Sequence, residues 1–292
     1  MSAGRRATSL LAALALALLT HVPTQGQAGA DTRRPGIAFM TPALQALQRD
    51  DSRNPAQLWI EEGRALWSQR GKSASGSGSS GSSSSSSSSG SANANASARA
   101  INNAETKACA DCHAAGSERG MAARYPAFDA ANNRPINLAG RIDQCRVRHQ
   151  QAAPQGAEGA EVLALTAYLA QASRGLAWQP PADQRLTAWS VRGESIWQQR
   201  LGQLNLACSH CHDQHAGARL GGAAIPQAHP TGYPTYRLEW QALGTLQRRL
   251  RGCLVGVRAE PFAPQADEWL ALEVYLSRRA AGMLLEGPAV RP

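Results

Sequence analysis

The sequence predicts a mostly α-helical protein in which one domain occurs twice in tandem. Three observations support this fold class: an apolar helical pattern near the end of each half, an internal repeat that aligns the halves, and one Cys-x-x-Cys-His motif in each half. The helical patterns cover residues 161–175 and 268–282, with leucine and tyrosine at helical spacing. Such a periodic apolar face more often forms hydrophobic core than a binding site, so we assign both stretches to the core.

The N-terminus has the organisation of a secretory signal. Arg5 and Arg6 precede an apolar run from Leu10 to Leu19, and Ala28-Gly29-Ala30 matches an A-x-A cleavage site. The apolar run is shorter than the ~20 residues that span a bilayer. We therefore expect residues 1–30 to be a cleaved signal peptide and the mature protein to lie in the periplasm, without a stable membrane span.

The composition of the 292-residue chain is basic, with a formal net charge of +9. Its only lysines are Lys72 and Lys107, so 28 of its 30 basic side chains are arginine. Much of this bias reflects overall composition, but guanidinium groups also bind oxyanions better than ammonium groups do. No run of five basic residues occurs, which argues against nucleic-acid binding. Six cysteines are too few for a disulfide scaffold in a chain of this length.

Each copy of the repeat starts with a Gly-x-x-x-Trp-x-Gln-Arg segment, which begins at Gly63 in the first copy and at Gly193 in the second. A Ser-rich stretch, residues 73–98, follows only the first of these segments and accounts for most of the extra length of that copy. Its residues offer little apolar surface to bury, so we expect a flexible loop without regular structure.

The rest of the repeat can be followed to the end of the chain. Pro180-Pro181 interrupts the helical pattern between the copies. We therefore expect a first domain at 31–180 and a second at 181–292. The matched pairs are Tyr125-Pro126/Tyr233-Pro234, Leu138/Leu246, Arg141/Arg249, Cys145/Cys253, Glu161/Glu268, Leu163/Leu270, Ala164/Ala271, Leu165/Leu272, Tyr168/Tyr275, Leu169/Leu276 and Gly175/Gly282.

The Cys-x-x-Cys-His motif of each copy has the spacing of a covalent haem c attachment site. The two thiols bind the haem vinyl groups as thioethers, and the adjacent histidine ligates the iron. A zinc pair or a thioredoxin-like dithiol would explain the cysteines, but less easily a histidine after each pair. We therefore expect two covalently bound haem c groups. The attaching cysteines and iron-ligating histidines are Cys109, Cys112 and His113 in the first copy, and Cys208, Cys211 and His212 in the second.

Two cysteines remain, Cys145 and Cys253, and they occupy equivalent positions in the two copies. A single disulfide between them is the simplest alternative in an oxidising compartment. Their equivalence instead favours each as the sixth ligand of its own haem iron, because no methionine occupies equivalent positions in both copies. Histidine is the competing ligand. The histidines available are His149 for the first haem, and His210, His215 and His229 for the second.

An arginine lies four residues before each lone cysteine, Arg141 before Cys145 and Arg249 before Cys253. On a helix, residues at this spacing share a face. A guanidinium beside the sulfur can hold an oxyanion through two parallel hydrogen bonds, or pair with a haem propionate. Smaller side chains follow Cys253 than Cys145, which indicates a more open second site. Further arginines that could join that site are Arg258, Arg278 and Arg279.

Together these residues resemble the SoxA family, whose members are subunits of thiosulfate-oxidising SoxAX cytochromes. The resemblance rests on two Cys-x-x-Cys-His motifs, a lone cysteine after each, and Arg249-x-x-x-Cys253 followed by Arg258-Ala259-Glu260-Pro261. It implies two class I-like cytochrome c domains with mostly α structure. The Ser-rich insertion departs from the family pattern, but it lies in a loop. The iron ligands that the resemblance implies are His113 and Cys145 for the first haem, and His212 and Cys253 for the second.

The resemblance also implies an activity. Cys253 corresponds to the active-site cysteine, often found as a persulfide, and Arg249 to the arginine that contacts the substrate. The expected reaction joins thiosulfate oxidatively to a cysteine of the carrier SoxYZ, and two electrons leave through haem. The expected partner subunit is SoxX, a small monohaem cytochrome that forms a heterodimer with SoxA.

Two other functions compete with this one. A non-catalytic dihaem electron-transfer protein would need neither the spare cysteines nor Arg249. A dihaem peroxidase would need one open distal site, which Cys253 would fill.

Overall fold

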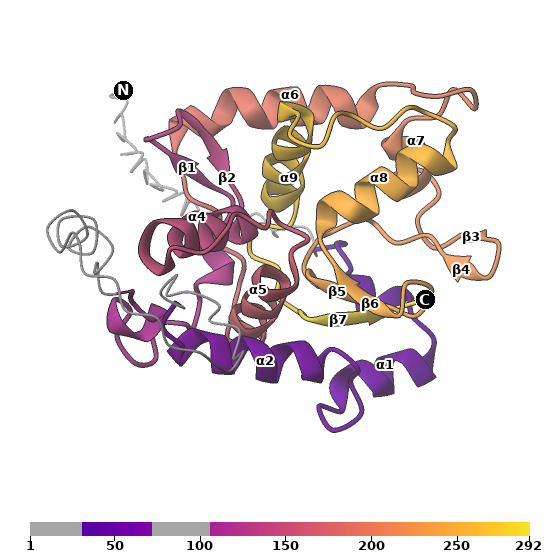
Figure 1. Ribbon diagram of the computed structural model, residues 1–292. Helices are drawn as coiled ribbons and strands as arrows, with labels where there is room; N and C mark the ends of the chain where they lie inside the picture. Colours follow the sequence, from indigo (N-terminus) through magenta and orange to yellow (C-terminus); the bar gives the residue numbers. More distant parts are fainter. Residues whose placement is uncertain (1–30, 72–105) are drawn as a thin grey trace, which may run out of the picture. The chain divides into compact units, whose positions relative to one another are not determined.

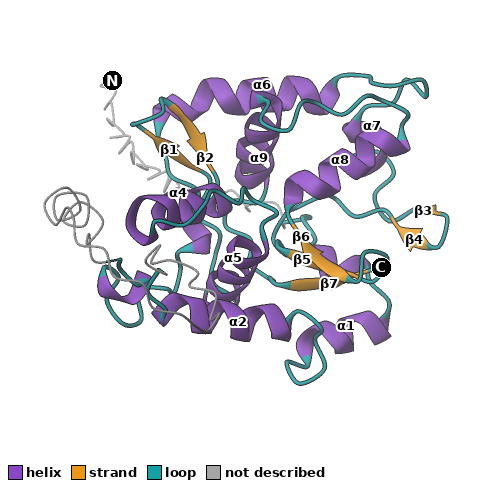
Figure 2. Ribbon diagram, in the orientation of Figure 1, coloured by secondary structure: helices purple, strands orange, loops and turns teal. Residues whose placement is uncertain are grey.

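The computed structural model describes residues 31–71 and 106–292. The predicted signal peptide, 1–30, and the Ser-rich stretch, 73–98, lie outside the described residues. Residues Arg33–Pro292 form one compact unit (Figure 1). Helices predominate over short strands in this unit (Figure 2), which confirms the mostly helical fold class.

The first copy has one core helix before the first attachment motif in the sequence and the other after it. Its elements are α1 (Pro42–Arg49), α2 (Gln57–Ser68), β1 (Ala127–Asp129), β2 (Arg134–Ile136), α4 (Leu138–Gln150) and α5 (Ala160–Ala172), with 3₁₀ turns at Gly36–Phe39, Cys109–Asp111 and Ala122–Arg124.

The second copy repeats this order and adds a hairpin after its attachment motif. Its elements are a 3₁₀ turn at Gln184–Leu186, α6 (Thr187–Gln198), α7 (Cys208–His212), β3 (Arg219–Leu220), β4 (Ala223–Ala224), β5 (Thr235–Arg237), β6 (Ala242–Gly244), α8 (Leu246–Gly256), α9 (Asp267–Arg279) and β7 (Ala289–Arg291).

A glycine in each copy allows two helices to cross at close distance. A Cβ atom on Gly63 would lie 2.1 Å from the carbonyl oxygen of Ala164, and one on Gly193 would lie 2.1 Å from that of Ala271. Any larger residue would therefore push α2 away from α5, or α6 away from α9. The two crossings lie at opposite edges of the view in Figure 1. They join the residues that match in the repeat, so the predicted core helices are confirmed.

The second copy forms a small sheet, and the two copies share a core cluster. Strand β5 pairs antiparallel with β6 and parallel with β7, in the order β6-β5-β7. Beneath it, Ala56 and Ile60 of the first copy pack with Tyr236, Leu243 and Val290 of the second. Because these side chains form one cluster, the copies are packed against each other, and their division into domains at residue 180 stays a prediction.

Candidate haem sites

The first attachment motif begins with a 3₁₀ turn, Cys109–Asp111, that ends two residues before its histidine. The backbone N–H of His113 donates to the Cys109 carbonyl oxygen at 3.0 Å. The Trp67 ring of α2 packs against the imidazole, with ring centroids 5.3 Å apart. Cys112 and His113 are both exposed. The turn therefore presents its second thiol and its imidazole outward, beside the α2–α5 crossing.

The second attachment motif forms the short helix α7, and its histidine is held more firmly. His212 Nδ1 lies 2.7 Å from the carbonyl oxygen of Pro226. A carbonyl only accepts hydrogen bonds, so Nδ1 carries the proton and Nε2 is the nitrogen that can ligate a metal. Burial lowers the pKa of His212, which favours the neutral imidazole that ligation requires. The Trp197 ring packs against it at 5.6 Å, as Trp67 does in the first copy.

Each lone cysteine lies close to the attachment motif of its own copy. Burial raises the pKa of Cys109 to about 11, and the neighbouring Cys145 adds to this rise. Burial likewise raises the pKa of Cys208 to about 11, with Cys253 as the neighbour that adds to it. No disulfide joins any of the six cysteines, so the structure does not contain the alternative bridge between Cys145 and Cys253. Iron ligation by these two sulfurs stays a prediction.

Both lone cysteines lie on helices, as the spacing of their arginines required. Cys145 lies on α4, which begins after the N-cap residue Asn137, and Cys253 lies on α8, which begins after Thr245. Each cap side chain accepts a hydrogen bond from a backbone N–H of the first helical turn. The arginine and the cysteine are one helical turn apart in each copy, so they share a face of the helix.

The arginine of the first site is neutralised by its surroundings. Arg141 Nη2 forms an ion pair with the Asp129 carboxylate at 3.3 Å, and its Nη1 donates to Gln144 Oε1 at 3.2 Å. Gln144 Nε2 in turn donates to Asp129 at 3.1 Å. Asp129 is almost fully buried at 5% exposure, so the pair is only weakly screened by solvent. Arg141 therefore has little capacity left for an external anion.

The arginine of the second site has none of these partners. Arg237 occupies the position equivalent to Asp129, and Gly252 occupies that of Gln144. Among the described residues, Arg249 makes no side-chain hydrogen bond or ion pair. Its Nη1 lies 3.9 Å from the point where a Cβ of Gly252 would stand, so no side chain at position 252 covers the guanidinium. The second site thus keeps a guanidinium available for an anion, one helical turn from a half-buried thiol.

A tyrosine completes each site, and the sequence analysis did not assign it a role. Burial raises the pKa of Tyr233 to about 12; Cys253 adds to the rise and Arg249 opposes it. Burial also raises the pKa of Tyr125, opposed by Arg141, which hydrogen-bonds its hydroxyl. The signal in the sequence was the Tyr-Pro pair that lies 20 residues before each lone cysteine, but the repeat alone did not distinguish core packing from a site.

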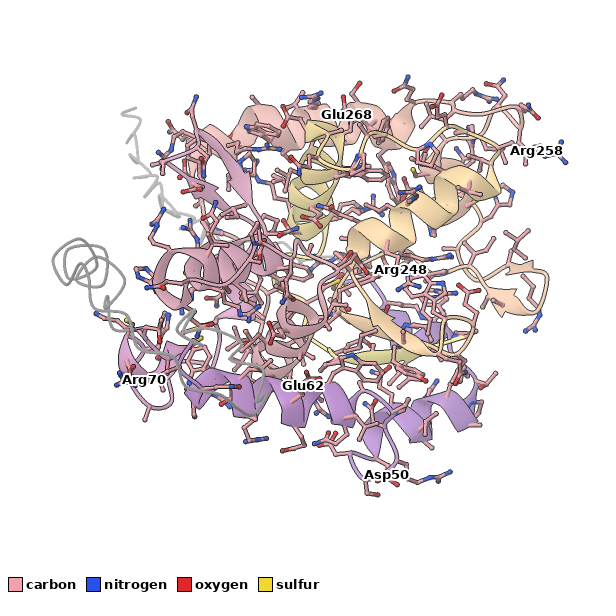
Figure 3. The ribbon with its side chains drawn as sticks, viewed as in Figure 1. Asp50, Glu62, Arg70, Arg248, Arg258 and Glu268 are labelled. Carbon is pink, nitrogen blue, oxygen red and sulfur yellow. The ribbon has the colours of Figure 1, made fainter. Side chains whose placement is uncertain are left out.

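The other arginines expected at the second site either make contacts of their own or are exposed to solvent. Arg279 Nη2 pairs with Asp213 at 2.7 Å, and its guanidinium lies 4.9 Å from the centroid of the Trp197 ring. Arg278 donates to a backbone carbonyl oxygen at 3.5 Å. Arg258 is exposed and points away from the protein in Figure 3. Asp213 therefore holds Arg279 beside the second attachment motif, where both Arg279 and Arg249 act on His212, and its part in the second site stays a prediction.

The competing histidines also have other contacts. His149 is exposed. The His210 ring accepts a hydrogen bond from the Ala207 N–H at 3.0 Å, which fixes it at the start of α7. His215 Nδ1 lies 2.6 Å from the His210 carbonyl oxygen. His229 is buried. His210 and His215 are thus held in local contacts, and Cys253 lies beside Tyr233 and close to the second attachment motif.

The fold and the two sites define a chain of the cytochrome c class. Each attachment motif supplies two thiols and one imidazole within five residues, packed under a tryptophan from a crossing helix pair. This donor set fits a covalently bound haem c. Across the described ranges, no helix is both long enough and apolar enough to cross a bilayer.

Comparisons with known proteins agree with this class. The family model "SoxA/TsdA, cytochrome c domain" matches residues 96–178 and 192–285. The chain is 31% identical to the L-cysteine S-thiosulfotransferase subunit SoxA of Pseudaminobacter salicylatoxidans, over 88% of this chain and 80% of that protein. It is 30% identical to the protein of the same name from Rhodovulum sulfidophilum, over 94% of this chain and 86% of that protein.

A solved structure is similar as well. The crystal structure of SoxXA from P. pantotrophus matches with a TM-score of 0.73 at 25% identity, over 89% of this chain and 87% of that one. The chain belongs to the SoxA/TsdA cytochrome c domain family. A cytochrome c domain implies haem c as the cofactor.

Proposed function

We propose that this chain joins thiosulfate oxidatively to a cysteine of a carrier protein, as the SoxA subunit of an L-cysteine S-thiosulfotransferase. Relatives at 31% and 30% identity carry that name over most of their length. The observation that carries the proposal is the asymmetry between the copies. Arg249 is free beside Cys253, whereas the matching Arg141 is neutralised by Asp129.

The attachment motifs support two covalent haem c groups, one in each copy. When bound, haem c supplies a one-electron acceptor at each site. The proposed attachment residues are Cys109, Cys112, Cys208 and Cys211, and the proposed iron ligands are His113 with Cys145 and His212 with Cys253. The absence of a disulfide at either lone cysteine, and the nearness of each to its own motif, support this assignment.

The second site has the groups that the reaction requires. Joining thiosulfate, a dianion, to a carrier thiol forms one S–S bond and releases one proton and two electrons. Arg249 can bind two oxygens of the dianion with charge-assisted hydrogen bonds. We assign Cys253, carrying an extra sulfur as a persulfide, as the active-site cysteine that faces the bound anion. Tyr233 lies beside both groups and limits where the anion can lie.

The partners follow from the same family. We assign a SoxX-like monohaem cytochrome c as the partner subunit and SoxYZ as the carrier; the matching solved structure is of a SoxXA complex. No nucleic-acid partner is expected. We assign the periplasm as the compartment, reached after cleavage of residues 1–30, because the sequence there has the features of a secretory signal.

Replacing Cys253 by serine tests this function. The variant should lose thiosulfate coupling by at least ~100-fold, because a hydroxyl is a far weaker nucleophile and metal ligand than a thiolate. The control is Val255→Ser on the same helix, an exposed side chain at 58% exposure, which should couple thiosulfate normally. Absorption spectra check that both variants keep their haems. Full coupling by Cys253→Ser would show that Cys253 is not the active-site cysteine, and a wild type that couples no thiosulfate would leave a dihaem electron-transfer protein as the function.

A further inference from the structure

A cavity of about 110 Å³ lies where the two copies meet. Equivalent residues of the repeat line it in pairs, so it lies between matching faces of the copies. These pairs are Tyr125/Tyr233, Asn137/Thr245 and Thr166/Glu273. The wall of the cavity is mostly apolar, so the polar side chains of these pairs are the exception. The cavity is therefore a mainly apolar space, shared by the two copies, into which a few polar groups project.

Glu273 breaks the equivalence of these pairs. Its counterpart Thr166 donates a hydrogen bond to the Val162 carbonyl oxygen of its own helix, at 2.6 Å. Glu273 instead accepts a hydrogen bond across the copies, from Asn137 Nδ2 at 2.8 Å. It is only 6% exposed. Gln247 also hydrogen-bonds the carboxyl group, and burial raises the pKa of Glu273 to about 7.

The two tyrosines connect this carboxyl group to both candidate haem sites. Tyr125 and Tyr233 line the same cavity as Glu273. At their other ends, the Tyr125 hydroxyl binds Arg141 beside Cys145, and Tyr233 faces Arg249 and Cys253. A charge at Glu273 is therefore separated from each lone cysteine by one tyrosine in a buried, weakly screened region.

Several other charged groups on the surrounding elements have partners of opposite sign, whereas Arg249 on α8 has none among the described residues and faces Tyr233. Within the described residues, no cation lies within ion-pair distance of Glu273. The pairs on the elements packed around it are Glu158 with Arg248 at the start of α8, Asp267 with Arg134 between α9 and β2, Asp129 with Arg141 beside α4, and Glu286 with Arg291 beside β7.

We propose that Glu273 is a redox-linked proton site shared by the two haem sites: it takes a proton from solvent when a haem accepts an electron, and returns it when the electron leaves. One electron arriving at the iron and one proton arriving at the carboxylate cancel in charge, which a buried region of low dielectric favours. By linkage, the proton then favours the reduced haem by the same free energy. The proposal rests on the two haems of the proposed function but not on thiosulfate chemistry.

Redox titrations of the isolated holoprotein over a pH series on both sides of 7 test this proposal, with neither thiosulfate nor carrier present. The wild type should show the midpoint potential of at least one haem falling as pH rises through this range. Glu273→Gln keeps an oxygen that can accept from Asn137, but cannot ionise, so this part of the pH dependence should disappear. Glu62→Gln, an exposed carboxylate on α2 (Figure 3), is the matched control and should titrate like the wild type. Unchanged pH dependence in Glu273→Gln would overturn the proposal.

A second variant keeps the carboxyl group and moves its titration. Asn137→Thr places at this N-cap the residue that the second copy already uses at Thr245, where it caps α8. The variant removes the amide donor to Glu273, so the carboxylate loses a stabilising hydrogen bond. The inflection in the potential should therefore move to higher pH, and the infrared carbonyl band of a protonated carboxyl group should persist to higher pH with it. An inflection that does not move, or moves to lower pH, would contradict the proposal even if Glu273→Gln fails to fold.

Discussion

At the scale of single residues, two equivalent arginines have opposite roles because of their neighbours. Arg141 is neutralised by Asp129, and Gln144 holds both groups in place. Arg249 has Arg237 and Gly252 at the matching positions. The repeat therefore keeps the arginine and the cysteine but changes the charge around them. This change leaves the second copy, unlike the first, with a guanidinium that can bind a dianion.

Arg237→Asp should convert the second site toward the first. The new carboxylate occupies the place of Asp129 and should pair with Arg249, so thiosulfate would have to compete for the guanidinium. A charge-assisted hydrogen bond is worth about 1.5–3 kcal/mol, so KM for thiosulfate should rise by roughly ten- to a hundredfold. Arg237→Gln removes the same cation without adding a carboxylate, and should change KM far less. Equal effects of the two substitutions would show that the new carboxylate does not pair with Arg249.

Arg249→Lys should weaken thiosulfate use because a point charge cannot form two parallel hydrogen bonds. The expected result is a loss of roughly tenfold or more in kcat/KM, measured by thiosulfate coupling to the carrier. Arg251→Lys is a matched control on the same helix, where the side chain is exposed, and should retain activity. Unchanged kinetics in Arg249→Lys would instead make this arginine a partner of a haem propionate.

At the scale of elements, the close helix crossings set the stability of each copy. Gly193→Ala puts a methyl group where only 2.1 Å separates it from the Ala271 carbonyl oxygen, so α6 must move away from α9. Overpacking of this kind costs about 1–3 kcal/mol or more, and thermal unfolding should show the loss. Gly256→Ala is the control, because nothing lies within 4 Å of its new Cβ. The Gly256→Ala substitution should be neutral or stabilising, since alanine has a higher helix propensity than glycine. A stable Gly193→Ala protein would mean that the crossing is not tight.

The helices were predictable from sequence because their signals are local. The leucines and tyrosines of 161–175 and 268–282 mark α5 and α9 within one residue of their observed starts, Ala160 and Asp267. The sheet was not predictable in this way. Strands β5 and β7 have three residues each and lie more than 50 residues apart in the chain, so neither shows a periodic pattern of its own.

The site shows the same division between local and distant information. The motifs located the thiols, the histidines and the arginines, because fixed chemistry requires fixed spacing. The free state of Arg249 and the buried carboxyl of Glu273 depend instead on which side chains from distant segments meet, such as Asn137 with Glu273. The ion pair of Arg279 was not predictable for the same reason, since its partner Asp213 precedes it by 66 residues.

At the scale of the whole molecule, the chain should carry one haem for each attachment motif. Mass spectrometry of the intact holoprotein should show the mass of two haems bound covalently, and of a chain lacking residues 1–30. Replacing Cys109 and Cys112 together by alanine should remove one haem and leave the other, because each motif binds its own group. Loss of both haems would show that the second site depends on the first, and a single haem in the wild type would contradict the assignment.

The wild type should lose stability relative to a Glu273→Gln variant as pH rises, because Glu273 lies buried between the two copies. Its pKa is raised from 4.5 to about 7 in the folded protein, so the fold favours the protonated form. Between these values the folded state binds more protons than the unfolded state, and the free energy of unfolding therefore falls as pH increases.

The full loss in the free energy of unfolding is at most about 3 kcal/mol, from ~1.4 kcal/mol for each unit of pKa, and it is complete above about pH 7. Glu273→Gln should escape this loss, so denaturant unfolding should show it gaining stability relative to the wild type from about pH 4.5 to 7. Parallel curves for the two proteins would mean that Glu273 is already ionised at the lower end of this range.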